Sequence, residues 1–113
     1  MRNIIQTEEF CKFFQSLPQR PQTKLLYALN ILSSMKVLST KLVKKLVGTE
    51  FYELRISVDN EYRIILFSID NENVIEANDI LLLNGFLKKS KKDYDREIRM
   101  ASNILKRYEN EDR

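Results

Sequence analysis

Three apolar runs between Phe51 and Lys89 decide the fold of this 113-residue chain: FYELRI at 51–56, EYRIILF at 61–67 and ILLLNGFLKK at 80–89. β-Branched and aromatic residues dominate these runs, which is typical of sheet strands. Asp-Asn pairs at 59–60 and 70–71 fall between the runs, where turns are expected. The sequence therefore predicts a sheet in which the run at 61–67 is a central strand, because both of its faces are mostly apolar.

Helical patterns precede this sheet. The first predicted helix runs from Glu8 to about Leu17, with Thr7 as its N-cap and Pro18 as its stop. Pro21 suits the first turn of a second helix. One stripe of that helix is expected to face the sheet, formed by Leu25, Leu26, Leu29 and Leu32.

A further helix is expected after the sheet. It should begin near Lys91, behind a capping box made by Ser90 and Asp93, and fray from Glu109 onward. Its inner stripe would be Tyr94, Ile98, Ala101, Leu105 and Tyr108. The predicted fold class is α+β: a small, mostly antiparallel sheet with two N-terminal helices on one face and a C-terminal helix, all in one domain spanning residues 1–113.

Three details of the sheet are open or unusual. The segment Lys36–Val47 fits either a short helix or an irregular approach to the sheet. Asn78-Asp79 interrupts the pattern of the strand or strands from Val74 to Leu83 and predicts a bulge. Gly85 is expected to end the last apolar run before a lysine cluster.

Composition narrows the chemistry. The chain has no histidine and a single cysteine, so zinc-finger spacing, a Cys-His dyad and a histidine base are all excluded. Any catalysis must use Lys, Arg, Tyr, Asp, Glu or a hydroxyl group. No apolar run approaches the roughly 20 residues that span a bilayer, and no signal peptide is recognisable, so a cytoplasmic protein without membrane contact is expected.

Arg55 and Arg63 are the strongest functional signal, because each stands inside a predicted strand. A guanidinium is always charged, and its rigid fork matches two phosphate oxygens at once. On neighbouring strands the two arginines would aim at one spot. The alternative is structural: a pair of arginines satisfied by acids across the hairpin, namely Glu53, Glu61 or Asp59.

A basic run follows the last predicted strand, formed by Lys88, Lys89, Lys91 and Lys92. Such runs are commonly solvated surface. This one lies between a strand end and a helix N-terminus, and a helix N-terminus favours anions. Nearby, Phe86 either stacks on a base or belongs to the core, and Tyr94 is either a hydroxyl donor or a packed aromatic.

Together these motifs resemble the HigB branch of the RelE-type toxin superfamily. The resemblance is carried by Leu46-Val47-Gly48, Tyr52-Glu53-Leu54-Arg55, Tyr62-Arg63, Leu83-Asn84-Gly85-Phe86 and Lys88-Lys89-Ser90, whose order and spacing agree from Leu46 to about Ile98. It implies a type II toxin: a ribosome-dependent endoribonuclease that cuts translated mRNA without metal or cofactor. It also implies three partners: a cognate antitoxin, the ribosome and mRNA.

The resemblance also implies part of the site, because Arg55, Arg63, Lys88, Lys89 and Tyr94 match the family's catalytic positions. Glu53 is added as a catalytic candidate because it shares a strand face with Arg55. The candidate RNA-binding residues are Lys91, Lys92, Phe86, Lys44 and Lys45. Glu53 departs from the pattern of RelE proper, which has a lysine at this strand position, so the division of acid and base roles stays open.

The implied reaction needs a base for the ribose 2′-hydroxyl, an acid for the leaving 5′-oxygen and cations for the charged phosphorane. Arg55 and Arg63 would hold the phosphate, Lys88 or Lys89 would act as acid or stabiliser, and Glu53 or Tyr94 would transfer the proton. Two rival functions remain, a gyrase-poisoning toxin and a noncatalytic protein-binding module on the same scaffold. The gyrase-poisoning class generally lacks this arginine and lysine set.

Overall fold

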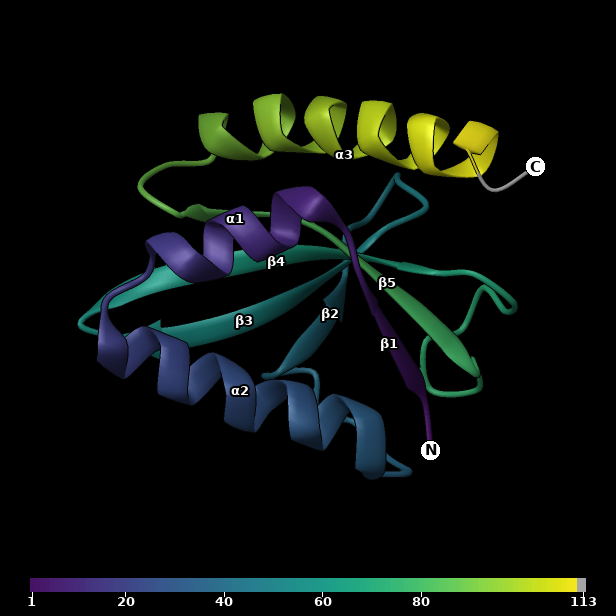
Figure 1. The fold of residues 1–113 in the computed structure, drawn as a ribbon, viewed down its shortest axis with the longest axis horizontal. Helices are drawn as coiled ribbons and strands as arrows, with labels where there is room; N and C mark the ends of the chain where they lie inside the picture. The colour runs from purple at the N-terminus through teal and green to yellow at the C-terminus, as the bar shows by residue number, and fades with distance from the viewer. Residues whose placement is uncertain (112–113) are drawn as a thin grey trace.

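The computed structural model describes residues 1–111, which form a five-stranded sheet flanked by helices (Figure 1). The strands are β1 (Asn3–Gln6), β2 (Val43–Lys45), β3 (Tyr52–Val58), β4 (Asn60–Ser68) and β5 (Asp79–Leu87). The helices are α1 (Glu8–Ser16), α2 (Gln19–Ser34) and α3 (Lys92–Glu111). The sheet order is β1-β5-β4-β3-β2, and every pairing is antiparallel except that of β1 with β5. The predicted α+β class and the central place of β4 are confirmed.

The two faces of the sheet carry separate cores. On one face, α1 and α2 bury Phe10 and Leu25 against β3 and β4 residues such as Leu54 and Ile64. On the other face, α3 buries Ala101 and other residues against Ile65, Leu81 and Leu83. The sheet is therefore covered by the N-terminal helices on one side and by α3 on the other (Figure 1).

Local signals place the helix ends. The Thr7 hydroxyl accepts a hydrogen bond from the backbone N–H of Phe10 at 3.2 Å, which confirms the predicted N-cap of α1. In α2 the predicted stripe is wrong at Leu26, which is 57% exposed, while Ala28 is buried in the core. α3 keeps its predicted inner stripe and remains helical through Glu109–Glu111, where fraying was expected; residues 112–113 lie outside the described part.

The open segment before the sheet resolves as an irregular approach that ends in the short edge strand β2. The bulge expected at 78–79 is wrong: β5 begins there, and its first backbone N–H groups are fixed by the Asp70 carboxylate. The irregularity lies further along β5, where the stretch from Leu82 to Gly85 faces the shorter stretch from Ile64 to Leu66 in β4.

Gly85 does not end β5, because the strand continues to Leu87. A Cβ at this position would lie 2.3 Å from the Cδ2 of Phe13. The glycine is needed because the ring of Phe13 in α1 lies directly against the backbone of β5.

The parallel edge strand β1 was not predicted, and the residue before it is a buried arginine. Arg2 is 6% exposed and donates five hydrogen bonds to backbone carbonyls of Leu32, Met35, Lys36, Val74 and Ile75. One side chain thus joins the start of β1 to the end of α2 and to the segment before β5. No helix among residues 1–111 is long and apolar enough to cross a membrane.

Candidate functional site

Strand pairing brings the two predicted arginines together. Arg55 of β3 lies directly opposite Arg63 of β4, and Glu53 of β3 lies directly opposite Lys44 of β2. Residues directly opposite one another, and residues two apart on one strand, point to the same face of a sheet. All four side chains therefore share the α3 face, where Arg63 meets Tyr94 in the first turn of that helix.

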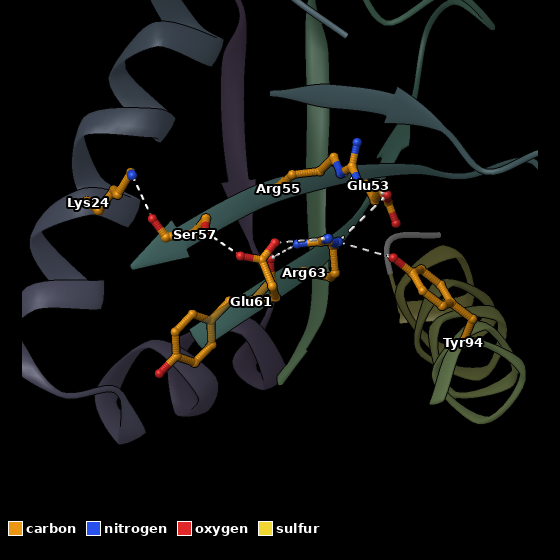
Figure 2. A network of polar contacts seen from close by, with 8 residues as sticks. Lys24, Glu53, Arg55, Ser57, Glu61, Arg63 and Tyr94 are labelled. Carbon is orange, nitrogen blue, oxygen red and sulfur yellow. Dashed lines mark hydrogen bonds and ion pairs between the residues drawn. The ribbon is translucent and has the colours of Figure 1, made fainter. Parts of the chain in front are cut away.

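Glu53 lies between the two arginines (Figure 2). Its Oε1 is 3.4 Å from Arg55 Nε and 3.8 Å from Arg63 Nε. Only 4% of Glu53 is exposed, and its Oε2 is buried with no hydrogen-bond partner among the described residues. A buried carboxylate in this position offsets the charge of two cations but has one oxygen unused.

Arg63 is held on several sides. Its Nε donates to the Tyr94 hydroxyl at 3.1 Å, its Nη1 to the carbonyl of Tyr62 at 2.9 Å and its Nη2 to Glu61 Oε1 at 3.3 Å. The residue is only 2% exposed. Arg63 therefore has acidic partners for a purely structural role, because both Glu53 and Glu61 form ion pairs with it.

Arg55 differs from its neighbour. Its side chain is 33% exposed, and the carboxylate of Glu53 is its one side-chain ion-pair partner within residues 1–111. An arginine with most of its donors unused at a half-open position can receive an anion from solvent.

Tyr94 enters the site from the first turn of α3. Its ring packs edge-on against Phe86 with the ring centres 5.4 Å apart. Burial raises the pKa of the Tyr94 hydroxyl above its usual 10.0, and the Glu53 carboxylate adds to this, while Arg63 opposes it. The hydroxyl is therefore a neutral group that keeps its proton near pH 7.

Two predicted lysines border the site from different elements. The Nζ of Lys88 is 6.0 Å from the centre of the Tyr94 ring, and its backbone N–H donates to the carbonyl of Glu61 at 2.8 Å. Lys44 is exposed on the edge strand, directly opposite Glu53. Together with the arginines, they surround the buried Glu53 with positive charge.

The other predicted residues make no polar contact with Glu53, Arg55 or Arg63 among residues 1–111. Lys89, Lys91 and Lys92 are exposed in the connection to α3 and at its first residue. Phe86 is only 8% exposed and belongs to the core under Tyr94. Lys45 turns to the opposite face, where its Nζ is 5.0 Å from the Tyr52 ring and where it borders a hollow of about 950 Å³ at the end of the sheet.

The start of α3 is fixed by Asp93. Its Oδ2 accepts the backbone N–H groups of Lys89 and Ser90, each at 2.9 Å, which confirms the carboxylate half of the predicted capping box. These hydrogen bonds lower the pKa of Asp93 from its usual 3.8. The backbone of the basic connection is thus held by Asp93, and Tyr94 is the next residue after Asp93.

One residue of the network was missed by sequence reasoning. Ser57 lies opposite Glu61 in the β3–β4 hairpin, and its hydroxyl donates to the Glu61 carboxylate (Figure 2). This contact is the first cause of the lowered pKa of Glu61, followed by Arg63. The hairpin turn at Asp59, which has a φ of 63°, sets this pairing. The Asp59-Asn60 turn signal in the sequence could have been used to predict that Ser57 faces Glu61.

The cluster combines an available guanidinium, a fixed guanidinium, a neutral phenol, a carboxylate and two lysines. These groups can bind a phosphate and move protons beside it. Among residues 1–111 no group of three or more His, Cys, Asp or Glu side chains is placed to hold a metal ion.

Comparison with known families and structures gives this arrangement a context. Residues 12–106 match the family described as phage derived protein Gp49-like (DUF891). The chain belongs to the Gp49-like family. No curated protein matches the sequence.

Two solved structures are similar to this Gp49-like protein. One is a chain of the intact E. coli RelBE toxin-antitoxin complex, with a TM-score of 0.58 and 17% identity over 80% of this chain and 100% of that one. The other is a mutant of the E. coli toxin RelE in the free state, with a TM-score of 0.61 and 16% identity over 90% of this chain and 95% of that one. These matches confirm the predicted RelE-type fold. The HigB branch stays a prediction.

Proposed function

We propose that this Gp49-like protein is the toxin of a type II toxin-antitoxin system and a ribosome-dependent endoribonuclease that cleaves translated mRNA. The observation that carries the proposal is the gathering of Arg55, Arg63, Glu53, Tyr94 and Lys88 on one face of a RelE-like fold. Solvent reaches the cluster at Arg55, whose side chain is 33% exposed, and a phosphate of bound RNA would enter from that side.

The geometry favours a division of labour between the arginines. Arg55 is half-buried with unused donors and would contact the scissile phosphate directly. Arg63 is nearly fully buried and would act as a positioning residue, holding Tyr94 and Glu53 in place. Lys88 would stabilise negative charge on the phosphorane from the rim of the site.

The proton transfers fall to Glu53 and Tyr94. In the reaction, a base takes the 2′-hydroxyl proton, the 2′-oxygen attacks phosphorus, and the bond to the 5′-oxygen breaks as that oxygen gains a proton. A phenol with a raised pKa is suited to donate a proton and poorly suited to take one. We therefore assign Glu53 as the base and Tyr94 as the acid.

The partners follow from the same proposal. A ribosome-dependent toxin of this kind would act in the cytoplasm on ribosomes carrying mRNA and would be neutralised by a cognate antitoxin. The RelBE structure is that of a toxin-antitoxin complex, and its likeness to this chain supports an antitoxin partner here. Lys89, Lys91 and Lys92 are exposed beside the site and would contact RNA backbone.

One observation favours a noncatalytic binding module instead. Arg63 already has two acids, a carbonyl and a hydroxyl as partners, so its charge is satisfied without any ligand. In that case the cluster would only stabilise the sheet. A purely stabilising cluster does not explain the unused donors of Arg55.

Inducing the gene in bacteria and mapping mRNA 5′ ends tests the proposal. We expect new ends inside translated reading frames, in phase with codons, and none after induction of Arg55→Ala. The matched control is Arg20→Ala, which removes an exposed arginine of α2, the helix on the other face of the sheet, and should leave cleavage unchanged. Intact mRNA with DNA damage would indicate a gyrase poison, and intact mRNA with arrested growth and undamaged DNA would indicate a binding module.

A further inference from the structure

The buried acid at the centre of the cationic cluster is poorly matched to its partners. Charge-assisted hydrogen bonds between nitrogen and oxygen are commonly about 2.7–2.9 Å long. Glu53 lies 3.4 Å from Arg55 Nε and 3.8 Å from Arg63 Nε. Its other oxygen makes no hydrogen bond of normal geometry within residues 1–111, and the Tyr94 hydroxyl that interacts with the carboxylate is a neutral donor. The Glu53 carboxylate offsets the positive charge of the arginines but does not form close hydrogen bonds with their N–H groups.

The surroundings of Glu53 would suit an anion with more oxygens. Lys44 is directly opposite it, Arg55 has unused donors, and Lys88 lies at the rim beside Tyr94. A phosphate has an oxygen for each of several such donors, whereas a carboxylate has two in one plane. Access is available from the side of Arg55, whose side chain is 33% exposed.

We propose that the Glu53 carboxylate occupies the anion position of the free protein and is exchanged for an RNA phosphate when substrate binds. This inference rests on the proposed function, because it names the event that opens that same site. In the free state Glu53 neutralises Arg55 and Arg63 and suppresses capture of stray phosphates. When a phosphodiester takes over Arg55, the carboxylate is released next to the reacting sugar, where a base is required.

The exchange has a direct consequence for affinity. Free RNA must displace an internal acid before it reaches Arg55, so binding at this site alone is weak. An mRNA held by the ribosome is presented at high effective concentration and can displace the acid more readily.

The test is binding of inorganic phosphate to the purified full-length chain. Glu53→Gln keeps the shape of the side chain and removes its charge, so we expect phosphate to bind about tenfold tighter than to wild type, the size of one charge-assisted hydrogen bond. Thermal stabilisation by phosphate over chloride at matched ionic strength gives the affinity. Glu61→Gln is the matched control, because Glu61 also pairs with Arg63 but its side chain is 49% exposed. It should bind phosphate like wild type, and Arg55→Ala added to Glu53→Gln should abolish the gain.

Equal phosphate affinity in wild type and Glu53→Gln would overturn the proposal, as would a gain that survives Arg55→Ala. A second measurement uses wild type alone, in case the variant does not fold. Phosphate titrated into the isotope-labelled chain should shift the Arg55 side-chain N–H signal in NMR spectra, and an unmoved signal at saturating phosphate would also refute the exchange. Absence of mRNA cleavage by the wild-type chain would refute the proposed reaction and leave the exchange standing. Failure of the phosphate tests would refute the exchange and leave the proposed reaction standing.

Discussion

At the scale of single residues, Arg63 links the stability of the sheet to the site. Its guanidinium contacts the Tyr94 hydroxyl, the Tyr62 carbonyl and Glu61 at once, in directions that only a planar fork can supply. Replacing Arg63 by lysine keeps a positive charge near Glu53 and Glu61, but a lysine cannot reproduce the three contacts of the guanidinium. Because Tyr94 is positioned from the same guanidinium, its orientation depends on Arg63.

We predict that Arg63→Lys remains folded and that its mRNA cleavage falls ~100-fold, because displacing a catalytic group such as Tyr94 by about 1 Å typically costs that much. Arg63→Ala should lower the free energy of unfolding by about 3 kcal/mol, because buried Glu53 loses a partner. Thermal melts and growth assays on both variants separate the two effects. A lysine variant as toxic as wild type would show that Arg63 is purely structural.

Tyr94 gives a prediction that depends on pH. Its folded pKa lies above the ordinary 10.0, so it favours the folded state fully below pH 10 and loses that contribution as pH rises through the folded pKa. Tyr94→Phe keeps the packing against Phe86 but lacks the hydroxyl. Melting temperatures should therefore be higher for wild type than for the variant at neutral pH, with a gap that narrows above pH 10. A gap that widens there would contradict the raised pKa.

Much of the site was readable from the sequence, for a physical reason. Strand alternation put Glu53 and Arg55 on one face, and the short hairpin turn brought Arg63 opposite Arg55. The sequence did not predict how side chains of the edge strand β2 and residues next to α3 would be oriented. Lys45 points to the far face, and Phe86 is covered by Tyr94, because the placement of β2 and α3 depends on distant packing.

At the scale of elements, the connection from β5 to α3 presents the basic run. Lys88 lies near the Tyr94 ring, whereas Lys89 is exposed and only its backbone N–H is held by Asp93. The two lysines are thus placed differently although they are adjacent in sequence.

We predict that Lys88→Ala with Lys89→Ala weakens ribosome binding and reduces its dependence on salt. The slope of log affinity against log salt falls by about 0.7–0.9 for each phosphate that the protein no longer neutralises. Affinity measured at several salt concentrations gives this slope. Lys106→Ala, at an exposed position late in α3, is the control. An unchanged slope in the double variant would assign both lysines to solvated surface.

Elements differed in how well the sequence revealed them. The long helices and β3 to β5 carry strong local patterns, and all were predicted. β1 and β2 have only four and three residues, which is too short for an alternating pattern to be recognised. In addition, β1 pairs with β5, which is distant in the sequence. Gly85 was misread as an end because the ring that demands it comes from α1.

At the scale of the whole molecule, Arg2 joins segments far apart in the chain. It satisfies carbonyls at the end of α2 and in the segment before β5 with five hydrogen bonds from its guanidinium. Lysine has three donors, so Arg2→Lys must leave at least two of these carbonyls without their partner. We predict a loss of about 1–3 kcal/mol in unfolding free energy, measured by chemical denaturation. Arg20→Lys, at an exposed ion pair, should change little, and equal effects of the two changes would refute the role of Arg2.

The central claim is that this fold and this site act on mRNA within the ribosome. The most direct measurement incubates the purified chain with an mRNA, once free and once bound to ribosomes with a defined codon in the decoding site, and maps the products. We predict cleavage at that codon on the ribosome, no cleavage of the free mRNA, and none with Arg55→Ala. Intact mRNA on the ribosome, or equal cleavage of the free mRNA, would contradict the claim.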